Sequence, residues 1–296
     1  MTSRELQIFM MVAECGKMSE AAKRMYITQS SVSQAVASIE KEYGILLFER
    51  LSNSLYITAE GKQLLSYARG FFSVKDDMEN FLTNASSVRR LRIGATVTVG
   101  TCVISPILKR VKEELPGIDV SVSVANTHIV EEKLLSNEID VGLVEGHIDN
   151  ADLVTTDVIS DRLVLVCPPG HRFASRDCVE LEELAGEEFI LREVGSGTRA
   201  LFEEQMNARN LKIDIKWSCY NSEAIKNAVM DGHGLSVISR RLVKDELTRG
   251  RLHACDIHGI DLSRHFAVVY HKNKYMGDEL KMFMAECRRF AEKDAY

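Results

Sequence analysis

One face of a predicted helix carries short hydroxyl and amide side chains where charged ones are usual. In QSSVSQAVASIEKEYG, Val32, Val36 and Ile39 recur at helical spacing and are expected to face a core. Glutamine can form paired hydrogen bonds to adenine, and serine can bond base edges or phosphates. A solvated face is the alternative, but it usually carries Glu and Lys, so the pattern favours contact with DNA. The residues of this face are Gln29, Ser30, Ser33, Gln34 and Ser38.

Two shorter helices are predicted before this one. Residues 4–14 place apolar side chains on one face at spacings of three and four, and Gly16 ends that helix. Ser19 is a suitable N-cap for a second short helix, and Thr28 can cap the third, which Gly44 closes. Three such helices with a polar outer face on the third are typical of a helix-turn-helix.

A small hairpin is predicted after the third helix. The runs ILLFER and LYIT lie on either side of LSNS and indicate two strands joined by a turn, a wing. Arg50 lies at the base of this wing, where it could reach a phosphate or the minor groove. A salt bridge from Arg50 to a neighbouring Glu fits the spacing equally well.

Charge does not support this interpretation by itself. The 296-residue chain has a formal net charge of −6, and residues 1–60 contain six Lys and Arg against seven Glu. The case for DNA therefore rests on placement rather than composition. The seven Cys are scattered without a C-x-x-C pair, so we expect neither a metal site nor a cofactor. With no apolar run of membrane length and a charged N-terminus, we expect a cytoplasmic protein.

The order and spacing of these features resemble a known family. The segments SEAAKRMYITQSSVSQAVASIEKEYGILLFER and LYITAEGKQLL are similar to the N-terminal domain of LysR-type transcriptional regulators of bacteria. The resemblance implies that Thr28, Gln29, Ser30, Ser33 and Gln34 face the major groove and that Arg50 holds the DNA backbone. Many relatives carry basic residues in the wing tip, whereas this chain has Ser52, Asn53 and Ser54, so each head should bind weakly and depend on avidity.

A long helix is predicted after the wing. Residues 59–85 contain no Pro, and apolar residues recur at alternating spacings of three and four, interrupted by Gly61 and Lys75. Packing on the core of its own chain is one interpretation, and pairing with a second copy is the favoured one. In the resembled family this segment is the dimerisation helix. We therefore expect residues 1–58 to form the winged helix-turn-helix, residues 59–88 to form the linker helix, and the protein to be a homodimer or homotetramer.

Alternating strand-like and helix-like runs fill the rest of the chain and indicate an α/β fold with a parallel sheet. Residues 89–296 resemble the effector-binding domain of the same family, which implies two lobes folded like periplasmic binding proteins. We place lobe I at about residues 91–161 and 267–296, and lobe II at about residues 162–266.

Hydroxyl-rich loops suggest where a small molecule would bind. One loop spans Thr96 to Thr101 after the first strand, and another spans Gly195 to Arg199. A helix start offers free N–H groups and partial positive charge, which suit an anion, although simple capping is the alternative. The resemblance places both loops at one cleft, and their helix starts and hydroxyls lead us to expect a small, anionic metabolite there. The expected effector-binding residues are Thr96, Thr98, Gly100, Thr101, Asn126, Thr127, Glu145, Ser196 and Thr198.

Other functions fit less well. The chain lacks the G-x-S-x-G and H-E-x-x-H motifs and a Lys-containing phosphate loop, so we expect no enzyme. A transport-type binding protein would not carry a DNA-reading head. A redox regulator acting through Cys219 is the alternative within the family. The resemblance also implies RNA polymerase as a further partner.

Overall fold

The computed structural model describes residues 1–51, 54–83, 89–146 and 148–293. The chain forms two compact units, one built from the N-terminal helices and strands and one that begins with the first strand of the effector domain. Within the described residues, no helix is both long and apolar enough to span a membrane.

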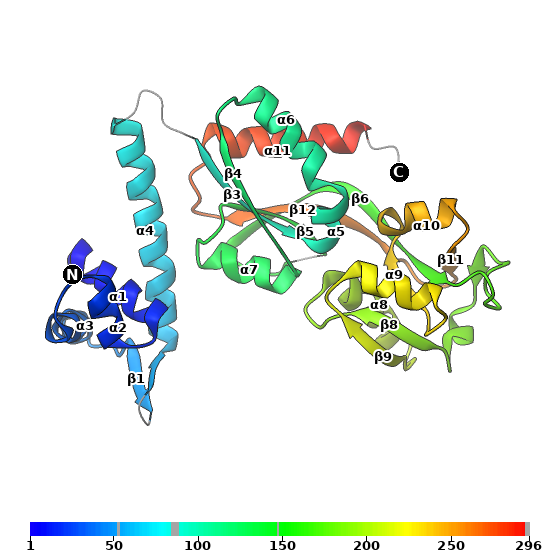
Figure 1. The fold of residues 1–296 in the computed structure, drawn as a ribbon, viewed down its shortest axis with the longest axis horizontal. Coiled ribbons are helices and arrows are strands. Elements are labelled where there is room, and N and C mark those ends of the chain that lie inside the picture. Colours follow the sequence, from blue (N-terminus) through cyan, green and yellow to red (C-terminus); the bar gives the residue numbers. More distant parts are fainter. Residues whose placement is uncertain (52–53, 84–88, 147, 294–296) are drawn as a thin grey trace. The chain divides into compact units, whose positions relative to one another are not determined.

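The N-terminal unit is a three-helix core with a hairpin and a long helix (Figure 1). The predicted core positions Val32, Val36 and Ile39 are buried, and they pack with Phe9 and Val12 of the first helix. The two strands pair in antiparallel register, as the predicted wing requires. The elements are α1 (Ser3–Cys15), α2 (Met18–Arg24), α3 (Gln29–Tyr43), β1 (Phe48–Leu51), β2 (Ser54–Ile57) and α4 (Ala59–Thr83).

Helix α4 has two chemically different halves. Its first half packs on the helix-turn-helix core, with Ala68 buried and Leu64 partly buried. A Cβ atom at Gly61 would lie 2.3 Å from the carbonyl oxygen of Leu47, so glycine is needed where α4 starts against the wing. The second half instead exposes an apolar stripe. The seam predicted for pairing is therefore partly used for packing within the chain. The stripe residues are Tyr67, Phe71, Val74, Met78 and Leu82.

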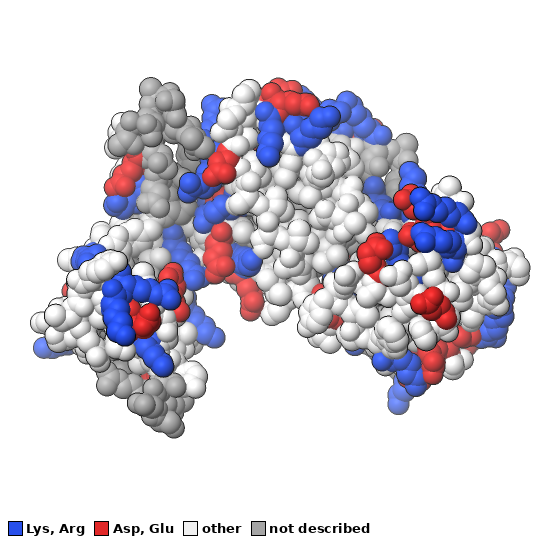
Figure 2. All heavy atoms as spheres, in the orientation of Figure 1, with Lys and Arg blue, Asp and Glu red and all other residues white. Residues whose placement is uncertain are grey.

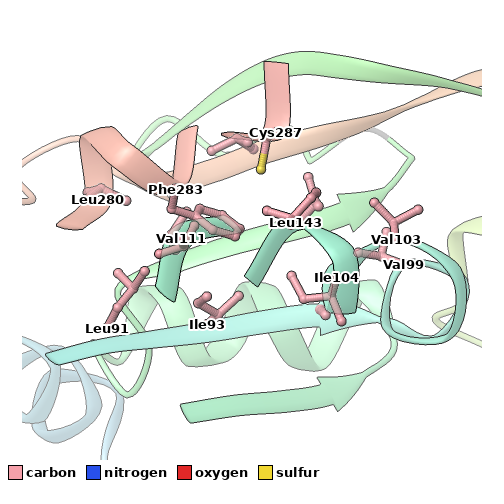
Figure 3. Close-up of a cluster of buried hydrophobic side chains, with 14 of the residues drawn as sticks. Leu91, Ile93, Val99, Val103, Ile104, Val111, Leu143, Leu280, Phe283 and Cys287 are labelled. Carbon is pink, nitrogen blue, oxygen red and sulfur yellow. The ribbon is translucent and has the colours of Figure 1, made fainter. Parts of the chain in front are cut away.

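Lobe I of the effector domain is a sheet covered by helices on both faces. Helices α6 and α11 cover one face and α7 covers the other (Figure 1). Under α6 and α11, apolar side chains such as Ile93, Leu143 and Phe283 form a buried cluster (Figure 3). The elements are β3 (Arg90–Thr96), α5 (Val97–Cys102), α6 (Ile104–Glu114), β4 (Asp119–Ala125), α7 (Thr127–Leu135), β5 (Val141–Glu145) and α11 (Asp278–Lys293).

Two long strands connect lobe I with lobe II. Strand β6 (Leu153–Cys167) pairs with β12 (Ser263–His271) up to Arg162 and then continues into the lobe II sheet. Strands β3, β4 and β5 are parallel, but β12 runs antiparallel to both β5 and β6. The predicted parallel pairing is present in β3, β4 and β5, and β12 is antiparallel because the strand that returns from lobe II must run in the opposite direction.

Lobe II is built around the second half of β6. Two apolar clusters lie on its two sides, one centred on Phe189 and Phe202 and the other on Ile190 and Ile225. The elements are β7 (Cys178–Val179), η1 (Leu181–Leu184), β8 (Glu188–Arg192), α8 (Gly197–Asn207), β9 (Asp214–Cys219), α9 (Ser222–Met230), β10 (Ser236–Ser239), η2 (Arg240–Val243), α10 (Lys244–Thr248) and β11 (His253–Ile257).

Candidate functional site

Helix α3 presents most of the side chains expected to meet DNA. Gln29, Ser30, Gln34 and Ser38 are exposed, while Ser33 is half-buried. Gln29 and Gln34 therefore combine exposure with the ability to form paired hydrogen bonds, and they are the strongest candidates for base contact.

The start of α3 is tied by hydroxyl groups. The Oγ1 of Thr28 accepts the Ser31 N–H at 3.1 Å and shares hydrogen bonds of 2.8 Å with the Ser30 and Ser31 hydroxyls. These bonds fix the first turn, so Thr28 serves as a cap as well as a candidate contact. Ser31 is exposed as well, although the sequence did not place it on the face expected to meet DNA.

Two further positions adjoin the elements that are expected to meet DNA, Tyr26 before α3 and Arg50 in the hairpin. Tyr26 is 95% exposed and has a φ of 55° in the turn between α2 and α3, a conformation that tyrosine rarely adopts. It was also missed, and a lone aromatic residue in a turn gives no periodic signal. The Arg50 side chain and the wing-tip residues 52–53 lie outside the described residues, although the Arg50 backbone pairs with Leu55 in the wing.

Several acidic residues of the head have structural roles. Glu40 accepts the N–H of Leu47 at 2.8 Å and so holds the entry to the wing. Glu42 pairs with the N-terminal amine at 2.8 Å, and that hydrogen bond lowers the pKa of its carboxyl. Glu5 accepts the Thr2 N–H, which lowers its pKa likewise. Figure 2 shows basic and acidic side chains next to one another on the face of this unit in view.

The effector domain contains a cavity of about 510 Å³ between its lobes. This volume is typical of small-molecule sites. The cavity lies beside the carboxyl end of β5 and the start of α8, where α/β folds commonly place ligands. Among the expected effector-binding residues, Thr127, Glu145 and Ser196 line the cavity.

A buried carboxylate joins the two lobes at the base of this cavity. Glu145, 2% exposed, accepts hydrogen bonds from the Thr98 N–H at 2.8 Å and from the Thr198 hydroxyl at 2.7 Å. Its Oε2 also pairs with Nη1 of Arg264 at 2.8 Å, and this Nη1 donates to Thr198 Oγ1 at 2.9 Å. We call Glu145, Thr198 and Arg264 the interlobe bridge, since Glu145 belongs to lobe I and Thr198 to lobe II.

The interlobe bridge keeps Glu145 ionised. Burial alone would raise the pKa of this carboxyl, but the charge of Arg264 and the hydrogen bonds from Thr198 and Thr98 hold it at about 2. The Glu145 backbone takes part as well, because its N–H donates to Thr96 Oγ1 at 3.1 Å. Thr96, Thr98 and Thr198 therefore lie behind the carboxylate rather than on the cavity wall.

Arg264 is the main site residue that the sequence analysis missed. Besides Glu145, it pairs with Asp161 through Nε at 2.7 Å, and the Ser239 hydroxyl donates to the other oxygen of Asp161 at 2.7 Å. Arg264 and Phe266 are two positions apart in β12 and both are buried. Residues two positions apart in a strand face the same side, so the spacing from the apolar Phe266 indicated that the charged Arg264 also faces inward.

Glycines allow the lobes to approach closely. A Cβ atom at Gly197 would lie 2.6 Å from the Glu145 carbonyl oxygen, and Gly195, with a φ of 88°, lies against Asn126 and His128. The loop before α8 thus contacts lobe I directly, and we call this conformation, with the two lobes in contact, the closed state.

The remaining expected residues do not line the cavity. The Thr101 hydroxyl donates to the Val97 carbonyl oxygen at 2.8 Å, and Gly100 faces Val124. Asn126 caps α7 through Oδ1, which accepts the Ile129 N–H at 3.0 Å. The loop from Thr96 to Thr101 therefore contributes fewer groups to the cleft than its composition suggested.

Cys219 offers little thiolate for oxidation. It is half-buried at the end of β9, and burial, followed by the negative charge of Glu193, raises the pKa of its thiol. Since the thiolate is the species that reacts with peroxide, a raised pKa slows oxidation.

Known protein families match nearly the whole chain. Residues 3–62 match the bacterial regulatory helix-turn-helix protein domain of the lysR family, and residues 84–292 match the LysR substrate binding domain. The RuBisCO operon transcriptional regulator of Allochromatium vinosum is 32% identical, over 92% of this chain and 90% of that protein. The relatives are transcriptional regulators and not enzymes.

Solved structures agree at the level of the fold. A full-length OxyR variant of Pseudomonas aeruginosa has a TM-score of 0.75 at 20% identity, covering 99% of this chain and 97% of that one. The CcmR regulatory domain of Synechocystis, solved with 2-PG, has a TM-score of 0.65 at 26% identity, covering 69% of this chain and 98% of that one. The three-helix head, the two-lobed domain and the two family matches lead to one conclusion: the chain belongs to the LysR family of bacterial transcriptional regulators.

Proposed function

We propose that this protein binds a specific DNA sequence through α3 and that a small metabolite in the interlobe cavity controls that binding. The observation that supports it best is a closed, two-lobed cleft on the same chain as a head with an exposed, uncharged Gln and Ser surface. The relative solved with 2-PG supports a small molecule as the ligand class. The regulator would act in the cytoplasm, where it meets DNA and RNA polymerase.

The three parts of the chain divide this work. Residues 1–58 contact DNA, residues 59–88 pair two or four copies, and residues 89–296 bind the effector. Pairing through α4 is supported by its apolar stripe, in which Phe71 is 49% exposed and Leu82 is 71% exposed. Because the head carries no net positive charge, two linked heads would supply the affinity that one lacks.

Effector binding would act on the relative position of the lobes. The interlobe bridge connects them directly, so a ligand that contacts both walls of the cavity would shift the balance between open and closed states. The anionic character expected from the sequence stays a prediction.

Substitution of Gln34 tests the DNA interface. Gln34→Ala should weaken binding to the operator about tenfold, because a paired hydrogen bond to a base contributes roughly 1–3 kcal/mol. Operator fragments would first be selected from random DNA and then titrated by fluorescence anisotropy. Gln63→Ala is the matched control, since Gln63 is exposed on α4. Unchanged affinity and sequence preference in Gln34→Ala would contradict the proposal for α3.

A further inference from the structure

The cavity wall is strongly acidic. Among the described residues that line it are five carboxylates, a single guanidinium, that of Arg264, and two imidazoles. With both imidazoles neutral, this wall carries four net negative charges. The carboxylates are those of Glu131, Glu145, Asp149, Asp157 and Glu204.

These charges surround the cavity from both lobes. Glu131 lies on α7 in lobe I and Glu204 lies on α8 in lobe II, while Asp157 belongs to β6. Arg264 does not offset the other four carboxylates for a ligand, because it already pairs with Glu145 and Asp161. A cleft lined by one sign of charge concentrates the opposite charge and repels its own. The wall therefore favours a cation over an anion.

Glu145 also occupies the donors that an anion would use. The Thr98 N–H, the Thr198 hydroxyl and Arg264 Nη1 all bind its carboxylate. An external anion would have to displace this buried, ion-paired group before reaching them. The carboxylate thus plays, within the chain, the part that the sequence analysis assigned to an anionic ligand.

Among the described residues that line the cavity, one has a buried donor without a protein partner. Arg264 lines the cavity, its side chain is only 4% exposed, and its Nη2 has no hydrogen-bond partner among the described residues. A buried guanidinium N–H without an acceptor is costly, so this atom indicates where a ligand acceptor would fit. The acceptor alone does not require a charged ligand, since a carbonyl oxygen suffices.

We propose that the effector is a small organic amine that is protonated at neutral pH and carries one hydrogen-bond acceptor. Its ammonium groups face the carboxylates of the wall, and its acceptor takes the hydrogen bond of Arg264 Nη2. This inference rests on the proposed function, since it names the ligand class for the same cavity.

Matched small molecules test the ligand class on the full-length protein. L-Lysinamide carries two amines and one carbonyl acceptor, 1,5-diaminopentane carries the amines alone, and sulfate and 2-phosphoglycolate represent anions. At equal ionic strength, calorimetry should give the tightest binding for L-lysinamide, weaker binding for 1,5-diaminopentane and the weakest for the anions. Tighter binding of either anion, or no binding of the amines, would overturn the inference.

Single charge removals locate the binding. Asp157→Asn and Glu204→Gln should each weaken L-lysinamide binding about threefold to tenfold, because each removes one attractive charge. Both side chains are exposed, so neither change should unfold the domain. Asp231→Asn is the matched control, since Asp231 is exposed at the end of α9 and outside the wall. Equal losses in the control would place the amine elsewhere on the surface and overturn the inference.

Removing the Glu145 carboxylate should allow the cavity to bind an anion. Glu145→Ser should bind sulfate, because the Thr98 N–H, the Thr198 hydroxyl and Arg264 become free to hold it, and sulfate should then raise its melting temperature. The wild type should show no such shift. If Glu145→Ser does not fold, Asp157→Asn and Glu204→Gln still test the ligand class.

The two proposals fail in different ways. Selective binding of an anion by the wild type would refute the amine as ligand class but leave the proposed regulator intact. Absence of operator recognition by the unaltered chain would refute the regulator itself.

Discussion

Glu145 shows how one residue can have its chemistry set by partners far away in the sequence. Arg264 lies 119 positions away and Thr198 lies 53 positions away, yet both contact the same carboxylate oxygen. Removing either partner would leave a buried charge poorly compensated, which usually costs several kcal/mol. The bridge is therefore expected to respond sharply to pH as well as to substitution.

The pH dependence of stability follows from the direction of the Glu145 shift. Its pKa in the folded protein, about 2, is lower than the ordinary value of 4.5. The stabilisation is therefore complete above about pH 5 and is lost as the pH falls toward 2, with a full value on the order of 3 kcal/mol. Glu145→Gln lacks this titration, so the stability gap between wild type and variant should narrow on acidification.

Urea unfolding of both proteins between pH 7 and pH 3.5 measures that gap. Glu182→Gln is a matched control, because Glu182 is exposed in η1 and lies outside the interlobe bridge. If the difference in unfolding free energy between the wild type and Glu145→Gln stays constant across this range, Glu145 is not held ionised by the bridge.

At the scale of the elements, α4 combines two tasks within one continuous helix. Its first half completes the core of the head through Leu64 and Ala68, and its second half leaves Phe71, Met78 and Leu82 exposed. An exposed apolar stripe of this length on one helix is expected to be covered in the assembled protein. The division explains why Gly61 interrupts the apolar repeat, since it lies where the helix meets the wing.

A charge placed in the stripe tests the pairing of α4. Met78→Asp should shift the protein toward smaller species in sedimentation experiments, because a carboxylate is costly to bury in an apolar interface. Operator affinity should fall with it, since linked heads depend on avidity. Asn227→Asp adds the same charge at an exposed polar position of α9, away from the stripe, and should leave the assembly unchanged. An unaltered oligomer in Met78→Asp would place the interface elsewhere.

The sequence patterns predicted helices and strands better than they predicted contacts between residues far apart in the chain. The spacing of Val32, Val36 and Ile39 identified the buried face of α3, because helical periodicity is a local property. Thr98, Glu145 and Thr198 were all singled out as ligand contacts, but the hydrogen bonds that join them to one another were not predicted. The position of Arg264 two residues before Phe266 indicated an inward-facing charge, but nothing in the sequence identified its partners Glu145 and Asp161, which lie on other strands.

At the scale of the whole molecule, the closed state of the effector domain depends on close contact between lobes. Gly197 lies against the backbone of Glu145, so even one added methyl group would be 2.6 Å from a carbonyl oxygen. Neither partner in this contact is a flexible side chain end. The clash can therefore be relieved only if the loop before α8 and the end of β5 move apart.

Gly197→Ala should shift the domain toward an open state. Separation would break the hydrogen bonds from Thr198 to Glu145 and from Arg264 to Thr198, and overpacking of this kind typically costs about 1–3 kcal/mol. Hydrogen exchange in residues 141–146 and 196–200 should rise about tenfold, while exchange in the lobe I core stays unchanged. The effector should bind more weakly, because part of its binding energy must restore closure.

Gly170→Ala supplies the comparison for this experiment. Gly170 also belongs to lobe II, and a Cβ atom there meets no other atom within 4 Å. It should match the wild type in both exchange and effector affinity. If Gly197→Ala also matched the wild type, the contact between α8 and β5 would not control closure, and effector binding would have to reach the DNA-binding heads by movement of another part of the domain.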